Sequence, residues 1–565
     1  MRDPRLFCVV GSGPAGMYAA DRLLTHYGAA ARVDILDKSP VPFGLVRSGV
    51  APDHASTKSV TNRFESVLRD PRVGFFGNAA LGRDVSVDDL APRYHAVVLA
   101  YGATGDRTLG VPGEETLRGA LSARRFVSWF NGDPEAHDDS LGVRSDDANA
   151  LSLHDEITRC LTGDATTTGD VLDDDEDDVR SERASSNDPR REKRRSRAAV
   201  IFGLGNVALD CARILLRDPK DLRATDICAP ALRTLERSVV DTVALVGRRG
   251  VAQAAFSPKE LRELLDLPDV DVRVYDDAVA AADEADLEAS RPRRRAREAI
   301  EKRKARGDAE RASGHAKTRK TLVVRFLRSP AALVARDDDA AQLGSVVLEV
   351  NELRGLPGSR RAVGTGATET IADVVIALRS VGYRSTPLEE RLEWDVPRDG
   401  GDDRRRVVVD RFKRSVPFDE SLGVVPNRFG RVTQTVSKGM GAGEWQVPGM
   451  YVVGWLKRGP RGIIGDNLVD AEETVGALVA DDERGMLRKP DFRFKDRGVA
   501  PVLEARKVRF VSKQGWARID AEERKRGAEA GKPREKLTSV AEMLRVADGD
   551  ADLESERERA RAEKR

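Results

Sequence analysis

Two glycine-rich segments, each placed between a short apolar stretch and a helical pattern, constrain the fold of this chain most strongly. The first follows apolar residues 6–10 and reads GSGPAG at 11–16. The second follows residues 198–202 and reads GLGNVA at 203–208. In such segments the first glycine permits a tight turn, the second lets the backbone approach a pyrophosphate, and the third small residue packs helix on strand. The sequence therefore predicts two Rossmann-like dinucleotide-binding units.

The residues after the second predicted strand of each unit differ in charge. In the first unit, the strand at 33–36 ends at Asp37, and an acid about 20 residues past the glycines can bond a ribose 2'-hydroxyl. In the second unit, the strand at 242–246 is followed by Arg248 and Arg249, whose guanidiniums suit a phosphate. We therefore expect FAD in the first unit and NADP in the second.

The second signature has an unusual spacing. The distance from Gly205 to Arg248 is about twice the usual distance between the glycines and the residue that contacts the ribose. An inserted segment between these two positions is therefore required.

Length, charge and cysteine content narrow the class of protein. A chain of 565 residues can form two or three domains, and its net charge of +1 gives no general attraction to nucleic acid or membrane. It contains no transmembrane-length apolar run, and the few residues before the first strand predict no signal or transit peptide. Cys8, Cys160, Cys211 and Cys228 show no CxxC spacing. We therefore expect no metal site, iron–sulfur centre or disulfide relay.

Charged segments interrupt the alternating strand and helix signals. One spans 133–197, a second lies at 281–320 and is clearest over 303–320, a third lies around 390–412, and a charged tail starts at Asp548. We interpret them as solvated insertions, because few apolar residues offset the entropy of ordering. Between them we expect buried strands at 75–76, 96–100, 321–326, 346–350 and 374–377.

Several longer motifs are too distinctive for a generic nucleotide fold. They are VPFGLVRSGVAPDH from Val41, VGRRGVAQAAFSPKELREL from Val246, LRSVGYRSTPLE from Leu378, VPFDESLGVVPN from Val416 and GWLKRGPRGIIGDN from Gly454. In order and spacing they closely resemble the adrenodoxin reductase family, which comprises FAD-containing NADPH to ferredoxin reductases. The resemblance covers nearly the full chain, including the segment from Asp520.

The resemblance implies an α/β fold with two doubly wound Rossmann-like domains. The FAD-binding domain is expected to be discontinuous, with a first part at 1–112 and a second part at 385–565. The NADP-binding domain is expected to be inserted at 113–384. The family also carries a long insertion before the arginine pair, which accounts for the unusual spacing.

The resemblance also implies site residues. The family usually has Glu where this chain has Asp37, and either carboxylate can accept a hydrogen bond from a ribose hydroxyl. His54 and Glu260 are expected in supporting roles, and hydride transfer itself requires no catalytic side chain. The residues expected at FAD are Gly11, Gly13, Ala15, Gly16, Asp37, Gly44, Leu45, Leu81, Trp455, Gly462, Ile463 and Ile464. Those expected at NADP are Leu204, Gly205, Asn206, Val207, Arg248, Arg249, Glu260 and Gly462.

Each of these assignments has a structural alternative. Asp37 could cap a turn, Trp455 could be a core aromatic, and the arginine pair could be a solvated turn. His54 could be a hydrogen-bonded structural histidine. Glu260 follows Lys259 on a predicted helix, where a surface ion pair is the ordinary interpretation.

The family's chemistry implies a small acidic [2Fe-2S] ferredoxin as electron acceptor, which predicts a basic docking face. An arginine-rich segment fits that face. A solvated charge run or a nucleic-acid patch is the alternative, although no aromatic residue is interleaved to stack on bases. The arginines are Arg291, Arg293, Arg294, Arg295 and Arg297.

Two other functions remain open at this point. A flavin-dependent monooxygenase would share two nucleotide-binding folds, and a non-catalytic nucleotide-binding scaffold would use the insertions to bind partners. The resemblance implies a mitochondrial, monomeric protein with no nucleic-acid partner. A cytoplasmic or plastid location is the alternative.

Overall fold

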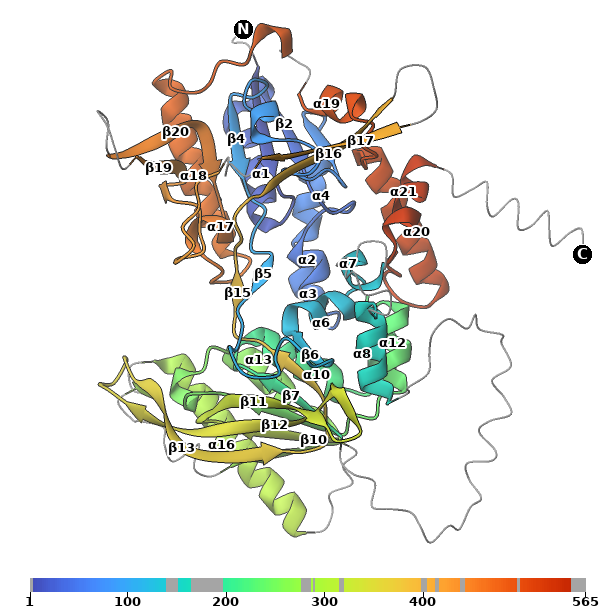
Figure 1. The fold of residues 1–565 in the computed structure, drawn as a ribbon, viewed down its shortest axis with the longest axis vertical. Helices are drawn as coiled ribbons and strands as arrows, with labels where there is room; N and C mark the ends of the chain where they lie inside the picture. The colour runs from blue at the N-terminus through green and yellow to red at the C-terminus, as the bar shows by residue number, and fades with distance from the viewer. Residues whose placement is uncertain are drawn as a thin grey trace, which may run out of the picture. The chain divides into compact units, whose positions relative to one another are not determined.

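The structure, a computed structural model, divides the chain into two compact units. Unit 1 comprises Met1–Arg107 and Gly382–Arg565, and unit 2 comprises Thr108–Val381 (Figure 1). The expected α/β class, with one doubly wound unit inserted into another, is confirmed. The described residues are 4–138, 151–163, 197–275, 286–287, 290–313, 320–397, 404–411, 416–436, 443–494 and 498–549.

Unit 1 is built on a seven-stranded sheet with the order β18-β19-β20-β4-β1-β2-β3. Strand β1 pairs in parallel with β2 and β4, with Phe7 opposite Val33 and Ala96. Its central strands are apolar along their length, as expected for a parallel sheet covered on both faces. The strands are β1 (Arg5–Val10), β2 (Ala31–Leu36), β3 (Val73–Phe76), β4 (Ala96–Leu99), β18 (Asn427–Arg428), β19 (Arg431–Val436) and β20 (Gly443–Val452).

Helices α1 and α18 pack against each other in unit 1. Apolar residues of these helices, such as Leu23 and Leu478, belong to one core cluster. The β1 residues whose side chains point to the other face of the sheet, such as Cys8, belong to a second core cluster. The helices are α1 (Pro14–Tyr27), η1 (Gly28–Ala30), α2 (Leu45–Ser48), α3 (Ala55–Lys58), α4 (Thr61–Arg69), α5 (Val87–Leu90), α17 (Trp455–Arg458), α18 (Asp466–Glu483), η4 (Phe492–Phe494), α19 (Ala500–Ala505), α20 (Lys513–Glu529) and α21 (Val540–Asp548). Two short pairs complete it: β5 (Gly105–Asp106) with β15 (Tyr383–Arg384), and β16 (Glu390–Pro397) with β17 (Arg404–Arg411).

Unit 2 contains a six-stranded sheet with the order β6-β14-β7-β8-β10-β9 and a three-stranded sheet with the order β11-β12-β13. All pairs in the six-stranded sheet are parallel. The strands are β6 (Ala120–Ser122), β7 (Ala198–Phe202), β8 (Thr242–Val246), β9 (Val270–Val274), β10 (Lys320–Arg325), β11 (Arg328–Arg336), β12 (Asp339–Arg354), β13 (Arg361–Ile371) and β14 (Val374–Arg379). Strands form at all five ranges expected outside the glycine signatures. The strand expected at 346–350 is part of the much longer β12, and only Val346 and Leu348 of that range are buried.

The helices of unit 2 explain the long spacing in the second signature. After α10 the chain forms α11 and α12 before it enters β8, so the required inserted segment is a pair of helices. The helices are α6 (Ala123–Phe130), α7 (Pro134–His137), α8 (Leu153–Thr162), α10 (Asn206–Leu216), α11 (Pro219–Leu222), α12 (Ala229–Glu236), η3 (Val251–Gln253), α13 (Pro258–Leu265) and α16 (Arg291–Ala312).

Parts of the charged segments are ordered elements, which corrects their interpretation as solvated insertions. Within 133–197, α7 and α8 form, and Ile157 and Leu161 of α8 are fully buried at i, i+4 spacing. Within 281–320, the buried Arg303 of α16 donates to the carbonyls of Leu265 and Val270. Around 390–412, β16 and β17 pair. Residues 164–196 and 314–319 and most of the tail after Asp548 lie outside the described residues.

Two further observations concern the cysteines and the hydropathy of the helices. All four cysteines are buried and unpaired by disulfides, consistent with packing roles for Cys8 and Cys211. Within the part of the chain that the structure describes, every helix is too short or too polar to cross a lipid bilayer.

Candidate dinucleotide sites

Both glycine-rich loops leave the carboxyl end of a central parallel strand in the same way. Gly11 has φ 110°, and a Cβ there would lie 2.5 Å from the Ala100 carbonyl oxygen at the end of the neighbouring strand. Gly203 has φ 125°, and a Cβ would lie 2.2 Å from the Ser380 carbonyl oxygen. Both positions thus require glycine for conformation and for space. The two loops are structural counterparts.

The helices that follow these loops begin without side-chain caps. Gly13 is the N-cap of α1 and Gly205 the N-cap of α10, and neither helix start has a side-chain cap hydrogen bond. A Cβ on either glycine would meet nothing within 4 Å. By contrast, α6 and α13 are each capped by a serine hydroxyl. The first-turn amides of α1 and α10 therefore have no side-chain cap, and uncapped helix N-termini can bind phosphate groups.

Asp37 at the end of β2 holds the first glycine loop in place. Its Oδ2 accepts from the Ser12 amide at 2.7 Å and the Ser12 hydroxyl at 2.5 Å, and its Oδ1 accepts from the Ser39 amide at 2.9 Å. Burial raises the pKa of Asp37, while these hydrogen bonds act to lower it. A carboxylate has about four acceptor positions, so the three bonds leave Oδ1 able to accept one more. The turn-capping role and a ribose contact are therefore compatible.

The segment after β20 approaches the start of α1. A Cβ on Gly454 would lie 2.5 Å from the Ala15 Cβ, so the two backbones are close. Trp455 is half-buried, and its ring lies 5.1 Å from the Tyr383 ring at a tilt of 35°. The structure thus brings Ala15 and the Gly454–Trp455 pair together in unit 1.

The backbone of the predicted residues Gly462, Ile463 and Ile464 lies next to the start of α18. Asp466 accepts from the Ile463 amide at 2.8 Å, and the Ile463 side chain is 69% exposed. An exposed isoleucine held by a fixed turn offers apolar surface to a ligand. The approach of Gly462 to NADP stays a prediction.

The predicted residues Gly44 and Leu45 start α2 beside the first glycine loop. The Phe43 amide donates to the Ser12 carbonyl at 3.1 Å, and a Cβ on Gly44 would lie 3.1 Å from the Gly13 Cα. The loop that carries these residues is therefore in direct contact with the turn expected to hold the pyrophosphate.

A buried charge cluster behind this loop was not expected from the sequence. Glu523 is fully buried and pairs with Arg47 at 2.5 Å and Arg534 at 2.6 Å. Burial would raise the pKa of Glu523, but the two arginines outweigh burial and the pKa is lowered. Because Arg47 belongs to α2, helix α20 holds this loop against the glycine turn. The only signal was the resemblance of the segment from Asp520.

The second loop is braced by neighbouring residues of unit 2. A Cβ on Gly247 would lie 2.1 Å from the Leu204 Cδ1, so Leu204 packs over the end of β8. The Asn206 Oδ1 accepts from the Ser257 amide at 2.8 Å, which ties α10 to the start of α13. Val207 packs partly buried against the core of unit 2. The residues predicted at NADP phosphates therefore lie on a fixed turn.

Glu260 does not form the surface ion pair with Lys259. Its Oε2 lies 3.8 Å from the Nη1 of Arg213, whose side chain is 1% exposed, while Lys259 pairs with Glu263 at 3.8 Å. Glu260 thus lies toward α10, and its supporting role stays a prediction.

Arg248 and Arg249 follow β8 at the carboxyl end of the sheet, next to the second glycine loop. Arg248 is exposed and Arg249 is half-buried. Their backbone carbonyls accept from the Asn351 side chain at 3.1 Å and the Leu327 amide at 3.4 Å, respectively. Burial, followed by the positive charges of Arg248 and Arg293, lowers the pKa of Arg249. The pair is therefore anchored by its backbone and lies in a positive environment.

The five arginines predicted as one docking face lie on two faces of α16. Arg291, Arg294 and Arg295 are exposed, whereas Arg293 and Arg297 are half-buried. Arg293 and Arg297 share the packed face with buried Ala296 and Ile300, which corrects the expectation of a single five-arginine surface. The physical reason is the helical period of 3.6 residues, which turns neighbouring positions to different sides. Arg297 also pairs with Glu301 at 2.6 Å.

The remaining predicted residues have local structural roles. His54 is half-buried and precedes α3, and its carbonyl accepts from the Thr57 amide at 3.0 Å. Leu81 is half-buried, bridges to Val85 and packs on a core cluster of unit 1. Their proposed proximity to flavin stays a prediction.

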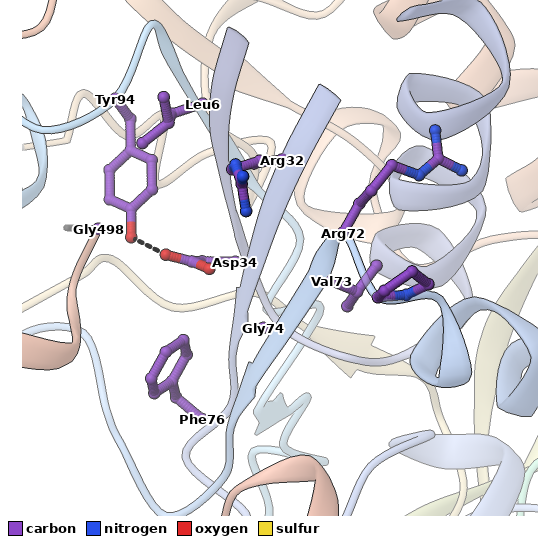
Figure 2. Close-up of a pocket in the computed structure, with 10 residues that line it drawn as sticks. Leu6, Arg32, Asp34, Arg72, Val73, Gly74, Phe76, Tyr94 and Gly498 are labelled. Atoms are coloured by element: carbon purple, nitrogen blue, oxygen red, sulfur yellow. Dashed lines mark hydrogen bonds between the residues drawn. The ribbon is translucent and has the colours of Figure 1, made fainter. Parts of the chain in front are cut away.

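A cavity in unit 1 lies away from the glycine loop. Figure 2 shows it over β1, β2 and β3, where the Tyr94 hydroxyl donates to the Asp34 Oδ2 at 2.5 Å. Asp34 lies in the middle of β2, and dinucleotides bind at the carboxyl ends of parallel strands. We therefore assign this cavity no part in dinucleotide binding.

Two Rossmann-like units with equivalent phosphate-type turns define a two-dinucleotide oxidoreductase fold. Residues 9–71 match the family model described as NAD(P)-binding Rossmann-like domain. The chain is 39% identical over 548 residues to the mitochondrial NADPH:adrenodoxin oxidoreductase of Arabidopsis thaliana, covering 96% of this chain and 95% of that protein. It is also 39% identical over 544 residues to the human protein of that name, covering 95% and 91%.

A solved structure agrees with these relatives. The Mycobacterium tuberculosis protein FprA in complex with NADPH matches with a TM-score of 0.73 and 34% identity, covering 96% of this chain and 99% of that one. The chain therefore belongs to the NADPH:adrenodoxin oxidoreductase family.

Proposed function

We propose that this protein is an FAD-dependent NADPH:ferredoxin oxidoreductase. The observation that carries this proposal is the pair of equivalent glycine turns followed by unlike residues, Asp37 in unit 1 and Arg248–Arg249 in unit 2. The names of the curated relatives and the solved NADPH complex support it. Unit 1 is then the FAD-binding domain and unit 2 the NADP-binding domain, with boundaries near those expected at 112 and 385.

The residues present fit both groups. In unit 1, the first-turn amides of α1 would donate to the FAD pyrophosphate, and the spare acceptor position on the Asp37 Oδ1 would accept from a ribose hydroxyl. In unit 2, the amides around Leu204–Val207 would donate to the NADP pyrophosphate, and Arg248 with Arg249 would bind the 2'-phosphate. When bound, the two groups together supply hydride transfer followed by release of single electrons.

The side chains of the protein bind and orient in this reaction. Hydrogen bonds between Ser12 and Asp37 fix the first turn. The ion pair of Arg47 with Glu523 holds the loop that contains Gly44 and Leu45 next to this turn. Trp455 offers an aromatic face beside that turn, and Glu260 is held toward α10 by Arg213. No nucleophile or general base is required, because orientation and distance carry the transfer.

We further propose that the exposed arginines Arg291, Arg294 and Arg295 dock an acidic [2Fe-2S] ferredoxin. Electrostatic complementarity of this kind accelerates association and fixes orientation. The plant and human relatives are named as mitochondrial, whereas the Mycobacterium tuberculosis relative is bacterial. A mitochondrial location is the proposal that follows, and a monomeric state stays a prediction.

The proposed activity is tested by flavin absorbance. Protein reconstituted with FAD is expected to carry about one flavin per chain. When it is mixed anaerobically with NADPH, its flavin absorbance at about 450 nm should be lost because the flavin is reduced. Added ferredoxin or ferricyanide should restore the absorbance and be reduced. A flavin-dependent monooxygenase would instead consume oxygen in step with an organic substrate, and a scaffold would stay colourless with added FAD. Either result would contradict the proposal.

Reversing the charge of the exposed arginine face should affect the kinetics with ferredoxin and leave the kinetics with other acceptors unchanged. Replacing Arg291, Arg294 and Arg295 with Glu is expected to raise the KM for ferredoxin by about tenfold or more at low salt, with the difference shrinking as salt screens the charges. Ferricyanide reduction by NADPH should stay unchanged. Steady-state kinetics with both acceptors measures this, and an equal loss with ferricyanide would place these arginines elsewhere in the mechanism.

A further inference from the structure

One arginine of the basic segment is turned away from the others. Successive helical residues are about 100° apart, so Arg293 lies about 200° around α16 from both Arg291 and Arg295. Exposure follows this geometry: Arg291 and Arg295 are exposed and Arg293 is half-buried. Arg293 therefore belongs to the side of the helix that packs on unit 2.

The side of α16 that carries Arg293 packs on the segment after the arginine pair. The one-turn helix η3 starts at Val251, two residues after Arg249, and α16 contacts it. Ala296 and Ile300, which follow Arg293 at i+3 and i+7, are in the same core cluster as Val251. Helix α16 is thereby held against the segment that follows the Arg248–Arg249 pair.

The result is a convergence of positive charge. The charges of Arg248 and Arg293 both act on the guanidinium of Arg249, which is also partly buried. Within the described residues, no carboxylate is paired with any of these three arginines. The N-cap Ser290 of α16 makes no side-chain cap, so the positive end of that helix is added to the cluster. Three like charges close together repel one another, and an anion bound between them would offset that repulsion.

We propose that Arg293 is a third 2'-phosphate ligand, which together with Arg248 and Arg249 determines the preference for NADPH over NADH. This inference rests on the proposed function, since it assigns a further residue to the NADP site. A phosphate monoester carries nearly two negative charges and several acceptor oxygens, and planar guanidiniums bind it in pairs. Arg293 acts here as a specificity residue and has no part in ferredoxin docking.

The experiment separates phosphate binding from turnover. The probes are adenosine 2',5'-bisphosphate, which carries the 2'-phosphate, and 5'-AMP, which lacks it. Both are titrated calorimetrically into the full-length, FAD-loaded protein. The Arg293→Gln variant is expected to bind the bisphosphate about tenfold more weakly, the loss of one charge-assisted contact, with 5'-AMP affinity and ferredoxin KM unchanged. The Arg293→Lys variant keeps the charge but not the planar fork, so its affinity for the bisphosphate should lie between those of the wild type and the Arg293→Gln variant.

A matched control removes the same charge from the same helix. Lys302 is exposed on α16 about 180° away from Arg293, and Lys302→Gln should leave bisphosphate affinity within about twofold, because it loses only long-range charge. Equal losses in the two variants, or an equal loss of 5'-AMP affinity in Arg293→Gln, would overturn the role of Arg293. If the wild-type protein itself does not prefer the bisphosphate over 5'-AMP, the NADP assignment of unit 2 fails as well.

Discussion

Replacing Arg248 and Arg249 together with Gln is expected to lower kcat/KM for NADPH by about a thousandfold while changing the value for NADH little. Each guanidinium offers the 2'-phosphate a charge-assisted contact of about 2 kcal/mol, so the pair supplies about 4 kcal/mol. NADH has no phosphate at this position, so the replacement removes no contact with NADH. The backbones of both residues are held by other groups, and side-chain replacement should leave the turn in place. Steady-state kinetics with both nucleotides measures the effect.

A second double variant controls for net charge. Arg233 and Arg237 are exposed, one on α12 and the other at its carboxyl-terminal cap, in the same unit. Replacing both with Gln also removes two positive charges, but at positions outside the glycine turn. The kinetics with NADPH should therefore be unchanged. Equal damage to NADPH and NADH use in the Arg248 and Arg249 variant would refute their contact with the 2'-phosphate.

Replacing Gly16 with Ala is expected to yield protein that does not retain FAD. In α1, a Cβ at this position would lie 1.9 Å from the Gly11 carbonyl oxygen and 3.1 Å from the Val9 Cγ1. The added methyl must push α1 away from β1 and thereby displace the turn that binds the pyrophosphate. Overpacking of this kind costs about 1–3 kcal/mol, and the displaced amides should weaken FAD affinity by about a hundredfold or more. The ratio of flavin to protein absorbance after gel filtration measures retention.

Gly476 provides the matched control for this variant. It also lies inside a helix of unit 1, in α18, but a Cβ there would meet nothing within 4 Å. Gly476→Ala should therefore gain about 1 kcal/mol of helix stability and keep its flavin. If the Gly16→Ala protein carried one flavin per chain, the close approach of α1 to the first glycine turn would have no role in FAD binding.

The glycine spacing was enough to predict both dinucleotide turns, because a tight turn, a close backbone approach and a helix start depend on residues adjacent in the sequence. The positions of Asp37 and of the arginine pair just after strands could be predicted for the same reason. The charged segments were harder to interpret. Residues 153–162 form a packed helix because two apolar residues at helical spacing suffice to bury one face, although the surrounding composition is polar.

Contacts between distant segments could not be predicted in this way. Nothing near Arg47 in the sequence indicates Glu523, because their pairing exists only once α20 packs beside α2. Asp37 looked like a ribose ligand, yet three hydrogen bonds also make it a brace for Ser12 and Ser39. These roles depend on the position of a partner in space.

The arginine-rich segment separates the two kinds of information. The sequence by itself determined that a basic segment precedes the last strands of the second unit. It also determined that one glycine turn is followed in its unit by an acidic residue and the other by two arginines. Only the tertiary structure decided that Arg293 is half-buried and that its charge acts on Arg249, while Arg291, Arg294 and Arg295 are exposed. The reason is physical: composition fixes how much charge a helix carries, but packing of its apolar side against the core fixes the direction in which each charge points.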